Sequence, residues 1–231
     1  MIALATLVLT SPPTVLQTLF LLALVLWTAR LTLYVVRRHL RASEEDGRYR
    51  RFREKGGAAF WWKSLITIFL LQAVLQWMIA SPVIAALGFA RPDPAIGLAA
   101  CGFLLFAIGF GVEAIADAQL ARHRNDPRAS GEVLTSGLWA WSRHPNYFGE
   151  VVLWWGLGLV AYALSGSLWS FLGPAVLTLV IRAISIKLTE EHVEAVRPDF
   201  AAYKARTAML VPRPPKPAQE SKSTSTSRAS G

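Results

Sequence analysis

Long blocks of apolar residues, separated by shorter polar connections, dominate the pattern along this chain. Five blocks each hold enough residues to cross roughly 30 Å of hydrocarbon as a helix that rises about 1.5 Å per residue. The blocks cover residues 15–36, 65–86, 95–116, 147–164 and 168–186. The pattern therefore predicts an all-α fold, a polytopic bundle of about five transmembrane helices.

A different pattern follows the last block. Over residues 189–210 apolar positions recur every three or four residues, which is the period of one face of a helix. These positions are Val193, Val196, Phe200 and Tyr203. We expect a cytoplasmic amphipathic helix that folds back beneath the bundle. From Arg213 onward Pro, Ser, Thr and Lys dominate, so the pattern predicts one membrane-embedded domain over 1–212 and a disordered tail over 213–231.

Lys and Arg are distributed unevenly among the connections between blocks. Nine lie in residues 37–64 and four in residues 117–146, whereas residues 87–94 hold one and residues 165–167 hold none. Positive residues collect on the cytoplasmic side of a membrane protein. We therefore expect the N-terminus outside and the C-terminus in the cytoplasm, and in a bacterium we expect the inner membrane.

Composition supports a membrane protein and narrows the class of partner. Hydrophobic residues make up 53% of the chain and charged residues 17%, against roughly a quarter charged in soluble domains. The net charge of +9 raises the question of nucleic acid, but the basic residues flank apolar blocks instead of forming one stripe. We expect membrane lipids as partners and no nucleic acid. Cys101 is the only cysteine, which excludes an intramolecular disulfide and a cysteine-based metal site.

Ionisable side chains within apolar blocks are costly, so each is a candidate for function. Arg30 and Tyr34 lie four residues apart in the first block, on one helical face. Glu113 and Asp117 have the same spacing near the end of the third block, and Arg124 continues that face. The simpler interpretation is that such residues extend to water at the interface. This interpretation suits Glu113 and Asp117 less, because their short side chains cannot reach far toward water.

The densest polar motif is the run Ser-Arg-His-Pro-Asn-Tyr-Phe-Gly-Glu at residues 142–150. Its proline suits the first turn of a helix, where a missing N–H costs nothing, so a helix start with unpaired backbone donors is predicted here. Arg143 and His144 add donors, and Asn146 and Glu150 lie one turn apart on one face. Such a group can hold phosphates, ribose hydroxyls and an amide. The alternative is an interfacial helix cap with an aromatic anchor.

Two further patterns have simpler explanations. Residues 109–114 match the Gly-x-Gly-x-x-Ala variant of a dinucleotide fingerprint, but they lie in an apolar helix with no preceding strand. Small residues that ease contact between helices are the favoured interpretation. His192 lies beside Glu190 and Glu191, yet the histidines of this chain lack the spacing of metal ligands. We expect no metal site.

Together these motifs resemble a known family, the DUF1295 group of membrane proteins. The resemblance rests on residues 113–120, 137–139 and 142–150, with shorter matches at 45–49, 69–72 and 203–212. It covers roughly residues 25–216, and the Asn-Tyr-x-Gly-Glu run that begins at Asn146 is its most specific part. DUF1295 proteins are similar to steroid 5α-reductases and sterol C14-reductases and, more distantly, to isoprenylcysteine carboxyl methyltransferases.

The resemblance implies NADPH as the cofactor, because the reductases bind it in a cytosol-facing cleft formed by their C-terminal helices. Residues at matching positions join the polar candidates above in one predicted cofactor-binding set. That set is Glu113, Asp117, Arg124, Arg143, His144, Asn146, Tyr147, Glu150, His192, Tyr203 and Arg206. The density of Arg near the motif suits the 2′-phosphate of NADPH.

The implied reaction delivers a hydride to an activated carbon–carbon double bond of a hydrophobic lipid, isoprenoid or sterol-like substrate that enters from the bilayer. An acid must then stabilise the charge that develops on a conjugated carbonyl oxygen. Alignment of Arg30 and Tyr34 with the Arg-x-x-x-Tyr of the reductases places Trp27 where they have a proton-donating tyrosine. Tyr34 and Tyr49 are therefore the candidates for the catalytic acid.

Two other functions stay open. The first is methyl transfer from S-adenosylmethionine, because the methyltransferase relatives also carry a His-Pro-x-Tyr-x-Gly run and a Glu-Glu pair. The second is a non-catalytic lipid-binding protein, suggested by Trp27 and by the short N-terminal region. Asn146 and Glu150 favour reduction, since they match the Asn-x-x-Gly-Glu positions of the reductases.

Overall fold

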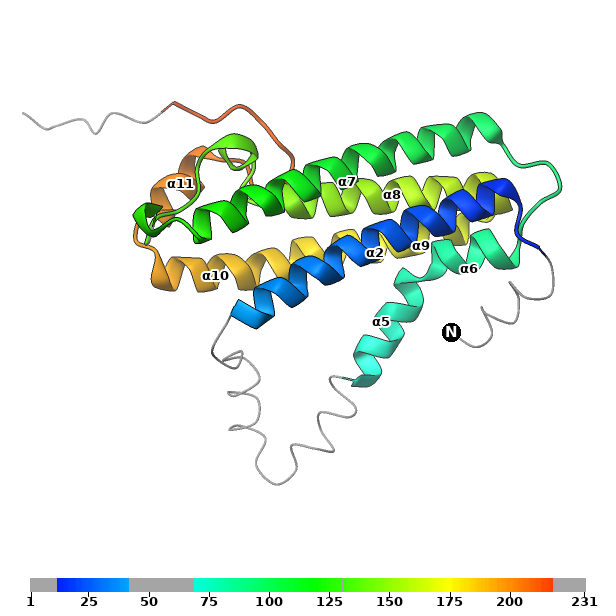
Figure 1. The fold of residues 1–231 in the computed structure, drawn as a ribbon, viewed down its shortest axis with the longest axis horizontal. Helices are drawn as coiled ribbons and strands as arrows, with labels where there is room; N and C mark the ends of the chain where they lie inside the picture. The colour runs from blue at the N-terminus through cyan, green and yellow to red at the C-terminus, as the bar shows by residue number, and fades with distance from the viewer. Residues whose placement is uncertain (1–11, 42–68, 130, 218–231) are drawn as a thin grey trace, which may run out of the picture.

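Helices form every regular element in the part of the chain that the computed structural model describes, residues 12–41, 69–129 and 131–217. The α-helices are α2 (Val15–Arg41), α5 (Leu71–Ile79), α6 (Ser81–Gly88), α7 (Ile96–Arg124), α8 (Pro145–Ser165), α9 (Leu172–Val180), α10 (Ile186–Val196) and α11 (Phe200–Arg206). The shorter turns are η3 (Pro127–Ala129), η4 (Gly137–Ala140), η5 (Leu168–Phe171) and the π-turn η6 (Ile181–Ser185). The long helices run side by side along the longest axis of the molecule (Figure 1).

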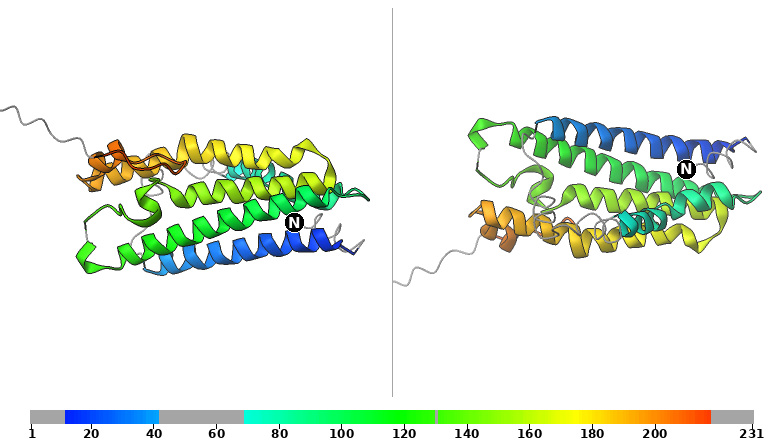
Figure 2. Two further views of the ribbon diagram at one scale, coloured as in Figure 1. Left: turned by 90° about the horizontal axis from the view of Figure 1, so that it is seen from above. Right: turned by 90° about the horizontal axis from the view of Figure 1, so that it is seen from below.

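The long helices form a layered bundle. Helix α8 lies between α7 and the α9–α10 helix, and α2 runs along the outer side of α7 (Figure 2). Phe20 of α2 packs with Leu153 and Leu157 of α8 in a core that also includes apolar residues of α6 and α7. These three side chains are fully buried, so the core lies where α2, α6, α7 and α8 meet.

Within the described residues, four helices are long and apolar enough to cross a membrane. They are Val15–Arg37, Ile96–Arg124, Pro145–Ser165 and Leu168–Val196. Helices α5 and α6 add a fifth crossing if the pair, which is bent by 47°, is one span. The predicted all-α, polytopic bundle of about five membrane helices is therefore confirmed.

The second apolar block is bent, a feature that its hydropathy does not reveal. Helix α5 ends at Ile79 and α6 begins at Ser81, followed by Pro82, which has no N–H to continue the helical ladder. The Ser81 hydroxyl accepts a hydrogen bond from the Gly173 N–H of α9 at 2.8 Å. A side chain at Gly173 would meet the Ile79 carbonyl oxygen at 2.4 Å, so only glycine lets α9 approach the bend this closely.

Glycines on facing sides allow α7 and α8 to pack backbone against backbone. A Cβ at Gly102 would meet the Gly156 carbonyl oxygen at 2.8 Å, and one at Gly109 would meet the Gly149 carbonyl oxygen at 2.5 Å. The two glycines of α7 are seven residues apart, as are the two of α8, so each pair lies on one face of its helix. The interpretation of Gly109 as a helix-contact residue, instead of part of a dinucleotide fingerprint, is thus confirmed.

The last apolar helix continues past residue 186 into the predicted amphipathic region, residues 189–210. The π-turn η6 joins α9 to α10 without a break, and the helix ends at Val196. Arg197 has φ −135° and ψ 98°, as expected for the residue before a proline. The segment that folds back is α11, which buries Phe200 and Tyr203 as the periodicity predicts. Val196, by contrast, is 57% exposed.

After α11 the chain runs without regular structure along the beginning of α8. The Arg143 N–H donates to the Ala208 carbonyl at 2.8 Å, and the Arg213 N–H donates to the Trp141 carbonyl at 3.0 Å. The Ser142 hydroxyl donates to the Leu210 carbonyl at 2.8 Å. The first residues of the predicted tail are thus attached to the bundle, and residues 218–231 lie outside the described part of the chain.

Candidate functional site

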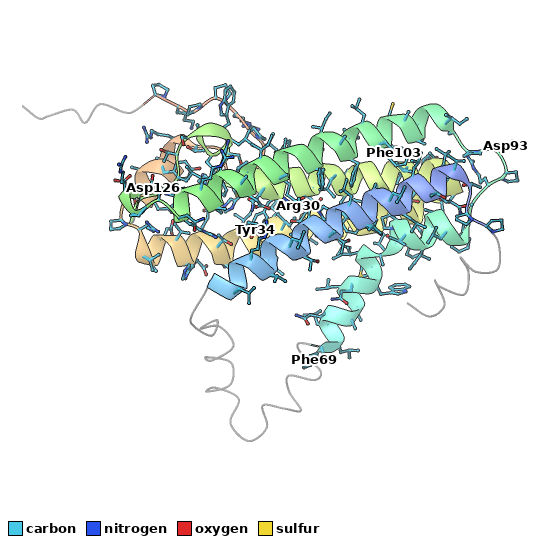
Figure 3. The ribbon with its side chains drawn as sticks, viewed as in Figure 1. Arg30, Tyr34, Phe69, Asp93, Phe103 and Asp126 are labelled. Carbon is cyan, nitrogen blue, oxygen red and sulfur yellow. The ribbon has the colours of Figure 1, made fainter. Side chains whose placement is uncertain are left out.

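Three membrane helices bring polar side chains together inside the apolar bundle, in what we term the central polar cluster: Arg30, Glu113, Asp117, Asn146 and Glu150. The Arg30 guanidinium pairs with the Glu113 carboxylate through one nitrogen and with Asp117 Oδ2, at 3.0 Å, through another. Asn146 Nδ2 donates to Asp117 Oδ1 at 3.3 Å. The structure thus unites four of the predicted cofactor-binding residues with Arg30 of α2, which carries Tyr34 one turn further along (Figure 3).

Close packing of α7 against α8 explains how the acidic side chains are buried. A Cβ at Gly149 would meet the Glu113 backbone nitrogen at 2.5 Å, so the two helices nearly touch beside the cluster. Glu113 and Asp117 are only 3% and 5% exposed. Buried carboxylates are tolerated only when paired, and Arg30 supplies the positive charge from α2.

Two tryptophans form the apolar side of the cluster. Trp27 Nε1 donates to Glu113 Oε2 at 3.1 Å, and the Trp27 ring meets the Trp154 ring edge to face with centroids 5.4 Å apart. Trp27 is therefore a hydrogen-bond donor to the cluster. Residue spacing within α2 does not predict this contact, since it depends on which helix lies beside it.

Three buried polar atoms near the cluster have no hydrogen-bond partner among the described residues. They are Arg30 Nε, Asn146 Oδ1 and Trp154 Nε1. Glu150 makes no hydrogen bond or ion pair within the described structure, although the charges of Asp117 and Arg30 act on it. Buried polar groups are normally paired in folded proteins. The cluster therefore offers both donors and acceptors that a ligand could satisfy.

A second group of polar residues, which we term the Glu190 cluster, joins α10 to the beginning of α8 and to α11. Glu190 Oε1 accepts from Arg143 Nε at 2.8 Å and lies 3.1 Å from His144 Nε2, while Lys204 Nζ lies 3.2 Å from Glu190 Oε2. Glu190 is buried. The predicted cofactor-binding set contains its neighbour His192, which lies on the exposed face of α10, and not Glu190.

The predicted donors of the 142–150 motif are engaged within the protein. Arg143 Nη1 donates to the Thr207 carbonyl at 2.7 Å and to the Lys204 carbonyl at 3.1 Å, and so satisfies groups at the end of α11. The His144 ring stacks on Tyr147 with centroids 5.4 Å apart. Burial lowers the pKa of His144, and its hydrogen bond to Glu190 opposes that change only in part.

Tyr203 fastens α11 to the turn before α8. Its hydroxyl donates to the Trp139 carbonyl at 2.6 Å and lies 3.2 Å from the Ser142 carbonyl. Burial raises the pKa of this phenol, with the charge of Arg143 acting in the opposite direction. Tyr203 is thus held as a neutral donor to backbone carbonyls.

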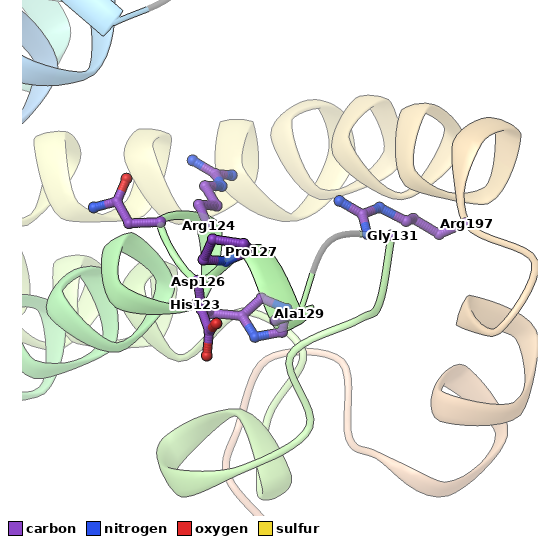
Figure 4. Close-up of a pocket in the computed structure, with 8 residues that line it drawn as sticks. His123, Arg124, Asp126, Pro127, Ala129, Gly131 and Arg197 are labelled. Carbon is purple, nitrogen blue, oxygen red and sulfur yellow. The ribbon is translucent and has the colours of Figure 1, made fainter.

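A pocket of about 250 Å³ lies where α7 ends, lined in part by three basic side chains, His123, Arg124 and Arg197 (Figure 4). His123 Nε2 lies 3.0 Å from the Glu132 carbonyl oxygen, and Arg197 Nη1 donates to the same oxygen at 3.0 Å. These contacts join the end of α7 and Arg197 to the backbone at Glu132. Asp126 also lines it, so the pocket is basic but not uniformly so.

A family model described as "Protein of unknown function (DUF1295)" matches residues 1–207 of the chain. The chain belongs to the DUF1295 family. No curated protein and no solved structure matches it. The resemblance seen in the sequence is confirmed at the level of the family.

The predicted residues of the DUF1295 chain also include His192, Arg206, Tyr34 and Tyr49. His192 and Arg206 are exposed, on α10 and α11. Tyr34 is half-buried on α2. Tyr49, the other candidate acid, lies outside the described residues. Among the described residues, no group of His, Cys, Asp and Glu is placed to hold a metal ion.

Proposed function

We propose that this protein is a membrane-embedded, NADPH-dependent reductase of a carbon–carbon double bond in a hydrophobic lipid, isoprenoid or sterol-like substrate. The central polar cluster is the observation that carries the proposal. Its five side chains come from α2, α7 and α8 and meet between helices that are otherwise apolar. Ionisable groups inside a membrane bundle are expensive and mark function by default. The apolar surroundings suit a substrate that enters from the bilayer.

The residues present fit NADPH at both of its ends. At the reactive end, Asn146 Oδ1 is buried and unpaired, and can accept a hydrogen bond from the carboxamide of a nicotinamide. At the other end, His123, Arg124 and Arg197 surround a pocket that suits a phosphate. Asp117 and Arg124 are separated by seven residues of α7, about 10 Å along the helix, a distance that a dinucleotide spans.

Each group then has a role in the proposed reaction. Bound NADPH would supply the hydride. Asn146 and Glu150, one turn apart on α8, would hold its nicotinamide end, and Arg30 would compensate the carboxylates beside it. Trp27 and Trp154 cover the cluster on its apolar side and exclude water from the reacting atoms.

The proposal includes an orientation. The basic pocket, the beginning of α8 and the end of α10 lie at one end of the bundle (Figure 1). The excess of Lys and Arg in the connections on this side supports a cytoplasmic location for it, together with the C-terminus. The cofactor would then bind from the cytoplasm, in a bacterium at the inner membrane.

Titration of the detergent-purified full-length protein with NADPH, NADH and S-adenosylmethionine tests the proposal. We expect NADPH to bind and to raise the thermal unfolding midpoint, because a ligand that prefers the folded state stabilises it. Asn146→Leu should weaken that binding, whereas Glu191→Gln, at an exposed carboxylate of α10, should not. Binding of S-adenosylmethionine alone would replace the reductase with a methyltransferase. Binding of neither would leave a lipid-binding protein.

A further inference from the structure

The central polar cluster holds more carboxyl groups than its positive charge can compensate. Glu113 and Asp117 pair with Arg30. Glu150 lies on α8 one turn from Asn146, which contacts Asp117, so three carboxyls share one guanidinium within the described structure. Arg30 divides its nitrogens between Glu113 and Asp117 and leaves Glu150 without an ion pair. Arg124 acts on Asp117 only through its charge from further along α7. An uncompensated carboxylate in apolar surroundings takes up a proton instead of staying charged.

Glu150 has an unsatisfied neighbour on its own helix. Trp154 lies one turn further along α8, is 6% exposed, and has an indole N–H with no acceptor among the described residues. Residues four apart on a helix lie on one face with their Cβ atoms about 6 Å from each other. A protonated Glu150 and Trp154 therefore offer two donors on the same face, which matches the two lone pairs of one carbonyl oxygen.

We infer that Glu150 is kept as the neutral acid of the site, and that with Trp154 it binds and protonates the carbonyl oxygen of a conjugated substrate. The inference rests on the proposed reductase function. It also explains why no tyrosine is needed at position 27, where Trp27 donates its side-chain N–H to Glu113. Glu150 is a catalytic residue in this assignment, whereas Trp154 positions the oxygen.

The proton and electron movements of the step balance. Bound NADPH would supply the hydride to the β-carbon of the conjugated double bond, and the π electrons would then move toward the carbonyl oxygen. The Glu150 O–H bond breaks as its proton bonds to that oxygen, which gives an enol and leaves Glu150 as a carboxylate. The enol then tautomerises to the saturated carbonyl compound. Glu150 regains a proton from water at the end of the bundle where α8 begins.

Infrared spectroscopy of the purified full-length protein at neutral pH tests this assignment without a known substrate. A protonated carboxyl has a C=O stretch distinct from that of a carboxylate, and it shifts in D₂O. We expect this band in the wild type and in Glu150→Asp, but not in Glu150→Gln. Asp117→Asn and Glu191→Gln should both keep it. Arg30→Lys should keep the band at its wild-type intensity, and Arg30→Ala should intensify it, because a second carboxyl then takes up a proton.

NADPH titration of the same samples separates the two proposals. If the wild type binds NADPH but has no protonated carboxyl, or if Glu150→Gln keeps the band, the acid assignment is wrong and the reductase proposal stands. If the band behaves as expected but NADPH does not bind, Glu150 is a neutral buried acid in a protein of another function. That outcome overturns its role as a proton donor in reduction.

Discussion

Arg30 is the residue on which the buried carboxylates of α7 depend. Because it pairs with both Glu113 and Asp117, its removal would leave buried negative charge uncompensated. We predict that Arg30→Ala lowers the free energy of unfolding by about 3–5 kcal/mol, the range measured when one partner of a buried ion pair is removed. Thermal unfolding in detergent measures the change. Arg37→Ala, at an exposed position of the same helix, is the control and should have little effect.

Arg124 supplies the sharpest test of cofactor choice. It lines the basic pocket, and a phosphate bound there is present in NADPH and absent from NADH. We predict that Arg124→Ala weakens NADPH binding by about 1–3 kcal/mol, as expected for a lost charge-assisted hydrogen bond, and changes NADH binding little. Calorimetric titration of both cofactors measures the difference. Arg122 is an exposed neighbour that does not line the pocket, so the Arg122→Ala variant should bind both cofactors like the wild type. If Arg124→Ala weakened the binding of both cofactors equally, the assignment would be contradicted.

His144 provides a pH-dependent test of the Glu190 cluster. Burial lowers the pKa of His144 in the folded protein below its ordinary value of about 6.5. As the pH falls through 6.5, the unfolded chain gains a proton that the folded protein does not yet accept, so stability decreases. We predict that the wild type loses stability between pH 7 and pH 5 more steeply than His144→Gln, by up to about 1.4 kcal/mol per pH unit. Exposed His192→Gln should follow the wild-type curve in thermal unfolding, and parallel curves for all three proteins would refute the expectation.

At the scale of the helix, the contact between α7 and α8 can be tested by a pair of neighbouring glycines. A methyl group at Gly109 would meet the Leu153 nitrogen at 2.4 Å, whereas a methyl group at Gly111 would meet nothing within 4 Å. We predict that Gly109→Ala destabilises the protein by about 1–3 kcal/mol through overpacking, and more if the backbones cannot separate. Gly111→Ala should be neutral or stabilising by up to about 1 kcal/mol, because alanine is the better helix former. Thermal unfolding of both variants measures the two changes in stability. Equal changes would show that the helices do not touch at Gly109.

Spacing along one helix predicted which polar residues share a face. Glu113 with Asp117 and Asn146 with Glu150 were each expected on a shared face, and the structure places all four in one cluster. The same reasoning located the five apolar blocks, since hydropathy reports the length of a span directly.

Contacts between helices could not be predicted in this way. The pairing of Arg30 with α7 and that of Glu190 with Arg143 depend on which helices are neighbours and how far each is rotated, and residue spacing contains neither. The bend at Ser81 and the continuation of the last helix to Val196 were missed for a related reason. Hydropathy falls at the membrane boundary, but the hydrogen-bonded helix does not have to end there.

At the scale of the molecule, the basic pocket lies at the end of the bundle toward which the beginning of α8 is directed, so access to the site depends on which side of the membrane that end faces. Arg128 lies in the connection at this end, and Ser165 ends α8 at the other. The distribution of Lys and Arg predicts that a reporter fused at Arg128 is cytoplasmic and one at Ser165 is on the opposite side. Alkaline phosphatase and fluorescent protein fusions at both positions measure this. If both report from the same compartment, α8 does not cross the membrane. If the two sides are reversed, NADPH would have to bind from outside the cytoplasm, and the proposed cofactor would be wrong even though the cluster is in place.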